Sequence, residues 1–176
     1  MLQIESVVRN SIRPVVIGAI GLCLSAPPAR AQDRLGGHFG VVFPLVTHAN
    51  GNTTNIGDDP KVGFPMGITV KTSDQYAFDL EIVPALDAQD HGPISVPLTI
   101  HPGVLRSLGN SWSAGLRMAF DIGGASWGFT PLLNKGFPMG GHTYFVEVVV
   151  PIRFQDDGLG DTHGAITLGV HVGVGF

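Results

Sequence analysis

Charged residues, cysteine and helical periodicity are all scarce in this chain of 176 residues. Only 14% of its residues are charged, and 10 Lys and Arg against 14 Asp and Glu give a formal net charge of -4. A nucleic-acid-binding protein needs a basic stripe that neutralises phosphates, so no nucleic acid is expected as a partner. The single cysteine, Cys23, excludes a disulfide scaffold.

Residues 1–31 have the pattern of a cleaved secretory signal peptide. Arginines precede an apolar run at Pro14–Ala26, which is shorter than the ~20 residues that a membrane-spanning helix needs. Ala29 and Ala31 then supply the small-x-small pattern that signal peptidase cleaves. We therefore predict export, followed by a single mature domain over residues 32–176 that contains no cysteine.

Apolar residues recur at every second position through most of the mature chain, and no segment keeps the period of an amphipathic helix. This pattern predicts half-buried strands and an all-β fold. The sixth of the eight expected segments has the weakest alternation. The expected strands are centred on Phe39–Leu45, Val62–Val70, Tyr76–Ile82, Val96–Val104, Trp112–Ile122, Trp127–Leu133, Tyr144–Phe154 and Ile166–Phe176.

The length of these segments and the sorting of their residues favour a barrel that spans a membrane. With their polar neighbours the segments have roughly nine to thirteen residues, whereas a tilted strand needs ~9 to 11 to cross a bilayer and strands of soluble domains most often have ~5 to 6. One face carries almost no charge, and the other holds Gly, Ser, Thr and nearly all charged residues of the strands. We therefore predict an eight-stranded antiparallel up-and-down transmembrane β-barrel.

The connections predict the orientation of this barrel. Those near residues 47–60 and 155–163 are long and polar, whereas those near residues 72–75 and 106–110 are tight. Outer-membrane barrels have long extracellular loops and short periplasmic turns, so both chain ends are expected in the periplasm. The short fifth connection, near residues 123–126, departs from this pattern.

Aromatic residues fall near the ends of the expected strands, where amphipathic rings occupy the headgroup layers of a membrane. These positions predict an aromatic girdle at each rim. The girdle residues expected on the periplasmic side are Phe39, Tyr76, Trp112, Tyr144 and Phe176, and those on the opposite side are Trp127 and Phe154.

An export signal, eight amphipathic strands and a last strand at Ile166–Phe176 that ends on an aromatic residue together resemble the small eight-stranded outer-membrane barrels of the OmpA transmembrane domain and OmpX type. The resemblance covers the mature chain and implies residence in the outer membrane of a Gram-negative bacterium. It also implies outer-membrane lipid and the barrel-assembly machinery as partners. In that family the last strand is the assembly signal, a role that would fall here to Val170, Val172, Val174 and Phe176.

The interior of an eight-stranded barrel is just wide enough to be filled by side chains, so an open pore is not expected. Charges in such a lumen must be paired. We predict a plug of Arg117 with Glu81 and Glu147, and an Arg153–Asp121 pair nearer the outer rim. The predicted polar network of the lumen comprises Asp79, Glu81, His101, Arg117, Asp121, Glu147, Arg153 and His171.

Catalytic and metal-binding patterns are weak. Ser126 lies in a G-x-S-x-G sequence, but that elbow needs a following helix and none is expected. The 7 histidines show neither of the i,i+2 and i,i+4 spacings that place two ligands on one face. We expect no cofactor, no metal and no enzymatic activity, with an outer-membrane lipid-modifying enzyme as an alternative.

A soluble periplasmic or secreted barrel of lipocalin type, which holds a small apolar ligand, is the main alternative because it predicts the same alternation with the two faces exchanged. Its cavity would be lined by Phe64, Phe78, Leu116 and Phe120. For the membrane barrel we expect a structural or surface-interaction role, carried by the loops at residues 50–59 and 156–161.

Prolines oppose continuous strands, because each removes a donor from the hydrogen-bond ladder. We expect bulges or shortened strands to accommodate them. The prolines within the expected strands are Pro44, Pro65, Pro97, Pro102, Pro131 and Pro151.

Overall fold

The structure, a computed structural model, describes residues 34–87, 96–124, 126–156 and 162–176. Within these residues no helix has the length and apolarity to cross a membrane. The predicted signal peptide, with Ala29 and Ala31 at its cleavage site, lies outside the described residues.

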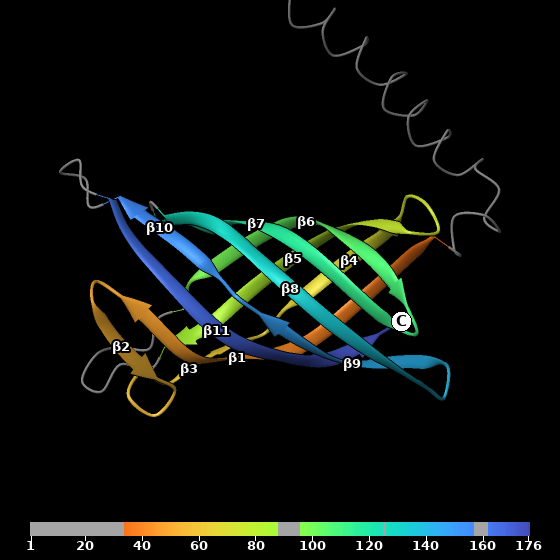
Figure 1. Ribbon diagram of the computed structural model, residues 1–176, viewed down its shortest axis with the longest axis horizontal. Helices are drawn as coiled ribbons and strands as arrows, with labels where there is room; N and C mark the ends of the chain where they lie inside the picture. Colours follow the sequence, from red (N-terminus) through yellow and green to blue (C-terminus); the bar gives the residue numbers. More distant parts are fainter. Residues whose placement is uncertain (1–33, 88–95, 125, 157–161) are drawn as a thin grey trace, which may run out of the picture. The chain divides into compact units, whose positions relative to one another are not determined.

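The described residues form one antiparallel sheet that closes on itself, because β1 is hydrogen-bonded both to β4 and to the last strand, β11 (Figure 1). The positions of the ring are occupied in chain order, as in an up-and-down barrel. The strands are β1 (Leu35–Ala49), β2 (Asn52–Asn55), β3 (Lys61–Gly63), β4 (Met66–Lys71), β5 (Tyr76–Asp87), β6 (Leu98–Gly109), β7 (Trp112–Ile122), β8 (Ser126–Met139), β9 (His142–Val149), β10 (Ile152–Asp156) and β11 (Thr162–Gly175).

These strands occupy eight positions in the ring. β3 and β4 follow each other between β1 and β5, and β9 and β10 follow each other between β8 and β11. β2 pairs only with the end of β1 and forms a hairpin with it. The predicted all-β fold with an eight-stranded antiparallel ring is confirmed, whereas its position in a membrane stays a prediction.

The prolines explain where the strands bend or break. Pro44 precedes a register shift in β1, so that Pro44 faces Gly169 and Val46 faces Leu168, while Leu45 has no paired residue. The expected regular alternation through Leu45 is therefore wrong, because a bulge places Val46 on the outer face instead.

Two further prolines separate strands that share one position in the ring. Pro65 lies between β3 and β4, and Pro151 lies between β9 and β10. The ladder continues across both breaks, since the Pro65 carbonyl accepts from Gly40 N at 2.9 Å and the Pro151 carbonyl accepts from Thr167 N at 2.8 Å. Of the prolines expected within strands, Pro102 and Pro131 remain inside continuous strands without a bulge beside them, Pro44 lies at the bulge of β1, and Pro97 precedes β6.

Tight turns join the strands at the end of the barrel where β1 begins and β11 ends, called here the short-turn end. Gly140 and Gly141, between β8 and β9, have φ of 61° and 87°. Positive φ at both central residues defines the type I′ turn, whose twist matches that of a hairpin. The opposite end, called the long-loop end, carries the β1–β2 hairpin and the ends of β5, β7 and β10 (Figure 1).

The two faces of the wall differ in polarity. On β7, Leu116 is 50% exposed on the outer face, whereas the neighbouring Arg117 is 3% exposed inside. The same alternation runs around the ring, so the outer wall is apolar and the lumen polar. Exposed apolar residues of the outer wall include Phe78, Leu80, Val104, Leu116, Met118, Phe120, Leu133, Val146, Val148 and Leu168.

Candidate functional site

Arg117, at the centre of β7, joins three carboxylates across the lumen. Its Nε donates to Asp79 Oδ2 at 2.8 Å, and its Nη1 donates to Glu147 Oε1 at 2.8 Å. Nη1 also lies 3.5 Å from Glu81 Oε2. All four side chains are buried, which leaves each charge dependent on this pairing. The structure thus brings together the three predicted plug residues and adds Asp79 to them.

Three histidines extend this cluster. His101 Nδ1 lies 3.0 Å from Glu81 Oε1, and His171 Nδ1 lies 3.2 Å from Glu147 Oε1. Because a carboxylate oxygen can only accept, both rings donate from Nδ1. His101 Nε2 must accept from Arg153 Nη2, 3.0 Å away, since a guanidinium has no acceptor. His101 is therefore a neutral imidazole in this network.

His38 of β1 has a carboxylate near each ring nitrogen, with Nε2 3.1 Å from Glu81 Oε2 and Nδ1 3.8 Å from Asp79 Oδ1. Only the Nε2 contact is short enough for a hydrogen bond. His38 therefore connects β1 to the carboxylates of β5.

The predicted pair of Arg153 with Asp121 is replaced by other contacts. Arg153 Nη1 donates to Thr130 Oγ1 at 3.2 Å, and Asp121 Oδ1 accepts from Thr99 Oγ1 at 2.6 Å. No direct ion pair joins Arg153 and Asp121 within the described residues. Cross-strand neighbours supply closer partners here, because Thr99 is paired with Asp121 in the sheet.

Sequence reasoning missed three members of the cluster: His38, Thr69 and Asn134. Thr69 Oγ1 donates to Asp79 Oδ1 at 2.7 Å, and Asn134 Nδ2 donates to Glu147 Oε2 at 3.4 Å. Each of the three lies on the polar face of its strand. The alternation of the two faces along the strand could therefore have indicated that these side chains point into the lumen. With them, the cluster receives side chains from all eight positions of the ring.

Gly40 leaves the space that His171 occupies. A Cβ at Gly40 would lie 2.4 Å from the Val172 carbonyl oxygen and 2.5 Å from His171 Nε2. The absence of a side chain on β1 therefore allows the buried imidazole to lie against the wall.

We expect Gly40→Ala to destabilise the barrel by about 1–3 kcal/mol, because the methyl group must displace His171 or the β11 backbone. Denaturant unfolding of the folded protein measures this change. Gly164→Ala is the matched control, since a Cβ at Gly164 meets nothing within 4 Å. Equal stability of the two variants would contradict the close packing of His171 against β1.

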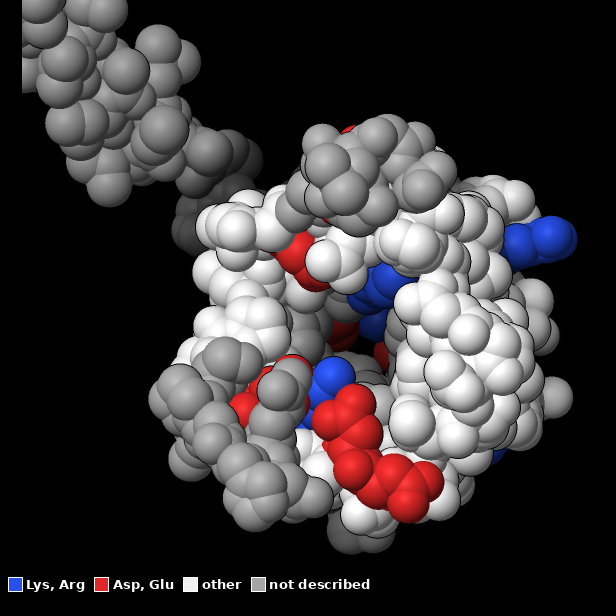
Figure 2. Space-filling model, turned by 90° about the vertical axis from the view of Figure 1, so that its left-hand side faces the viewer, with Lys and Arg blue, Asp and Glu red and all other residues white. Residues whose placement is uncertain are grey.

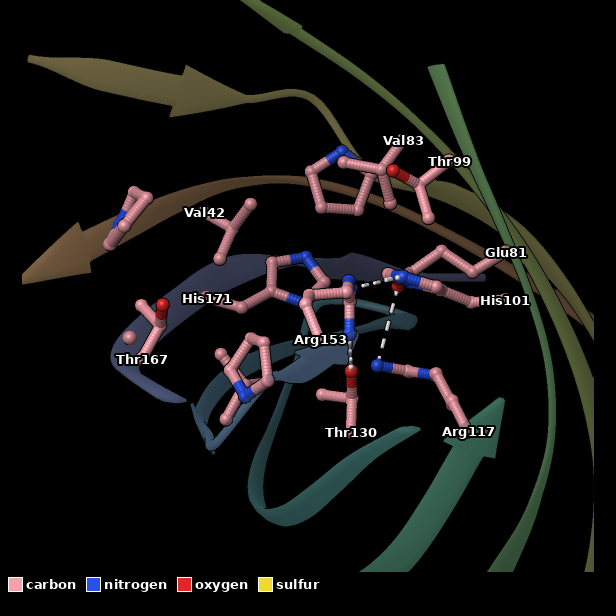
Figure 3. A pocket seen from close by; sticks show the side chains of 15 residues that line it. Val42, Glu81, Val83, Thr99, His101, Arg117, Thr130, Arg153, Thr167 and His171 are labelled. Carbon is pink, nitrogen blue, oxygen red and sulfur yellow. Dashed lines mark hydrogen bonds and ion pairs between the residues drawn. The ribbon is translucent and has the colours of Figure 1, made fainter. Parts of the chain in front are cut away.

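Beside the cluster, on the side of the long loops, the lumen holds a cavity of about 120 Å³ (Figure 3). Glu81, Arg117 and His171 from the cluster contribute to its lining, together with Arg153 and Thr130. Seen from the long-loop end, the barrel is hollowed, with basic side chains inside the opening and acidic side chains around it (Figure 2).

The residues predicted for the girdles lie at the two rims. At the short-turn end, Arg106 lies over the Tyr76 ring at 5.9 Å and Lys135 over the Trp112 ring at 5.2 Å. At the long-loop end, the Trp127 and Phe154 rings pack with centroids 5.0 Å apart. Phe39, Tyr144 and Phe176 are exposed at the short-turn end.

The predicted assembly residues lie on β11 at the seam where the ring closes. Val170, Val172 and Val174 pair with β1 on one side and β9 on the other. Phe176 continues the ladder, since its amide donates to the Gly37 carbonyl and its carbonyl accepts from the Gly37 amide, both at 2.9 Å. Their role in assembly stays a prediction.

Charges are distributed unequally between the rims. The short-turn end carries Arg34, Lys71, Arg106 and Lys135, with Asp74 in the first turn. At the long-loop end, Lys61 Nζ lies 3.0 Å from Asp59 Oδ2 and 3.3 Å from Asp87 Oδ2. Partial burial lowers the pKa of Lys61, but the hydrogen bonds and charges of the two aspartates outweigh it and raise the pKa above its usual value.

Ser126, the residue of the G-x-S-x-G pattern, begins strand β8 and is not followed by a helix. Among the described residues, no group of three or more His, Cys, Asp or Glu side chains is arranged to hold a metal ion. No known family model matches the chain, and no curated protein is significantly similar to it in sequence. The class defined by the fold and the lumen is therefore a closed eight-stranded barrel with a polar interior and an apolar exterior.

Proposed function

We propose that this protein is an integral outer-membrane β-barrel of a Gram-negative bacterium, with a structural or surface-interaction role and a lumen filled by side chains. The observation that carries the proposal is the inverted polarity of the wall. Large apolar side chains are exposed around the outside, while Asp79, Glu81, Arg117 and Glu147 are buried inside. Soluble monomers rarely expose contiguous apolar patches beyond a few hundred Å², whereas lipid requires such a surface.

Closure of the sheet supports the same proposal. A bilayer offers no water to unpaired backbone groups, so only helices and closed barrels span it. β7 has 11 residues and β5 and β6 have 12 each, which fits the ~9–11 residues of a tilted spanning strand with a short extension. Over the part of the chain that the structure describes, the ring has no free edge, and these three strands have the length that a membrane demands.

The rims support an orientation with the short-turn end in the periplasm. Four basic residues at that end would meet the anionic headgroups of the inner leaflet, and two of them cover aromatic rings. The short turns are also typical of the periplasmic side. The long-loop end would then face the outside.

Surface interaction would fall to the segment at residues 50–59, because it has a defined conformation outside the ring. β2 pairs with β1 to form a hairpin. Beyond it, Asn55 N donates to Asp58 Oδ2 at 3.0 Å and Gly57 N donates to Asn55 Oδ1 at 2.8 Å. The second predicted loop, at residues 156–161, lies largely outside the described residues.

The lipocalin-like alternative has less support, because the residues that it requires inside the cavity lie on the outer wall. Phe78, Leu116 and Phe120 are 42%, 50% and 44% exposed on the outer wall. The lipid-modifying enzyme has no specific observation in its favour.

Gel mobility with and without boiling tests the proposal directly. We expect the mature protein to be recovered in the sarkosyl-insoluble envelope fraction and to migrate faster before boiling than after, because a closed membrane barrel resists sodium dodecyl sulfate. Recovery in the soluble periplasm without a mobility shift would contradict it.

A further inference from the structure

The lumen cavity beside the ion-pair cluster has a lining in which apolar and polar side chains alternate. Its volume is about 120 Å³ (Figure 3). The apolar lining residues are Val42, Pro44, Pro65, Val83, Val149 and Pro151. The polar lining residues are Glu81, Thr99, His101, Arg117, Thr130, Arg153, Thr167 and His171. The Glu81 carboxylate is already paired with Arg117, His101 and His38.

Arg153 is the cation of this cavity and differs from Arg117 in its partners. Arg117 contacts three carboxylates, whereas Arg153 donates to the neutral acceptors Thr130 Oγ1, His101 Nε2 and the Ile152 carbonyl. Within the described residues no carboxylate oxygen lies within 4.0 Å of the Arg153 guanidinium. A guanidinium has five N–H donors, so Arg153 can also bind an anion within the cavity.

The polar and apolar lining residues together define the ligand. A carboxylate accepts two parallel hydrogen bonds from a guanidinium, and threonine hydroxyls can add further donors. The valine and proline side chains can bury an apolar tail. A cavity of roughly 150 Å³ in another protein holds a benzene molecule, so about 120 Å³ limits the tail to a short chain or at most one ring. Acidic side chains around the opening disfavour multiply charged anions (Figure 2).

We propose that the cavity is a binding site for a small monocarboxylate with a short apolar tail, whose carboxylate is held by Arg153. The site adds a ligand to a lumen that the ion-pair cluster crosses. The proposed binding site involves only residues of the lumen. It is therefore independent of whether the barrel lies in the outer membrane.

Benzoate is a suitable probe, with benzamide as its neutral counterpart of the same shape. The folded barrel is prepared in uncharged detergent micelles, its fold is verified by the gel shift, and the methyl resonances of Val42, Val83 and Val149 are followed by NMR. We expect saturable shifts with benzoate and binding of benzamide at least about tenfold weaker, because the charge-assisted hydrogen bonds are lost. Absence of saturable shifts, or equal binding of the two probes, would overturn the proposal.

Variants test the role of Arg153. We expect Arg153→Gln to raise the dissociation constant for benzoate at least about tenfold. The matched control Arg106→Gln removes an exposed arginine at the opposite rim and is expected to leave it unchanged. Unchanged benzoate binding in Arg153→Gln would refute the assignment. The benzoate and benzamide comparison uses the unchanged protein, so it decides the matter even where a variant does not fold.

Chloride gives a second test on the unchanged protein. A simple anion lacks the tail that the valine and proline side chains would bury, so its binding is expected to be at least about tenfold weaker than that of benzoate. Equal affinity for chloride and benzoate would contradict the apolar part of the site. Neither result bears on the membrane proposal, which rests on the outer wall.

Discussion

Arg117→Met is expected to destabilise the folded barrel by about 3–5 kcal/mol, the cost typical of removing one partner from a buried ion pair. The substitution preserves the volume and the apolar stem of the side chain but leaves Asp79, Glu81 and Glu147 without their shared cation. Denaturant unfolding, or the temperature at which the fast-migrating gel form is lost, measures the effect.

Arg106→Met is the matched control for this experiment. Arg106 is exposed and contacts the Tyr76 ring, so its loss is expected to cost no more than about 1 kcal/mol. Adding Asp79→Asn or Glu147→Gln to Arg117→Met should recover part of the lost stability, because each removes an unpaired negative charge. Equal stability of Arg117→Met and the unchanged protein would refute the role of the cluster.

Leu116→Lys is expected to destabilise the barrel in lipid by about 2–4 kcal/mol, the cost of a basic side chain near the middle of a bilayer. Leu116 lies midway along β7 and is half exposed on the outer wall. The comparison is made on protein folded into phospholipid vesicles, by denaturant unfolding or by the folded fraction on unboiled gels.

Met139→Lys adds the same charge at the rim and serves as the control. Met139 is 66% exposed at the end of β8, so a cost of about 0–1 kcal/mol is expected there. In a soluble barrel, both substitutions would place lysine in water and change stability by no more than about 0.5 kcal/mol. Equal, small effects at the two positions would therefore exclude lipid as the surroundings of the outer wall.

The fold could be predicted from the sequence because its main signal is local. Alternation along β5, β7 and β9 assigns each residue to one of two faces without knowledge of any neighbour. The prolines limited this reasoning. The alternation through Leu45 failed because a single unpaired residue reverses the parity of all that follow it in a strand.

Contacts across the lumen depend on the stagger between strands, and the alternation of apolar and polar residues gives no information about that stagger. The sequence placed Arg117, Glu81 and Glu147 on the polar face at similar heights, and the structure joins them. It could not distinguish Asp121 from Thr130 as the partner of Arg153, because strand shear decides which inward residues meet. His38 was missed for the same reason: its partners lie on another strand, 41 and 43 positions away along the chain.

The cluster around Arg117 connects side chains from all eight positions of the ring. A ring of strands without such contacts could flatten by small changes in the angle between neighbouring strands, whereas contacts across the lumen oppose flattening in every direction. Loosening one strand would therefore weaken the side-chain contacts that hold the other strands. The wall should consequently open as a whole rather than strand by strand.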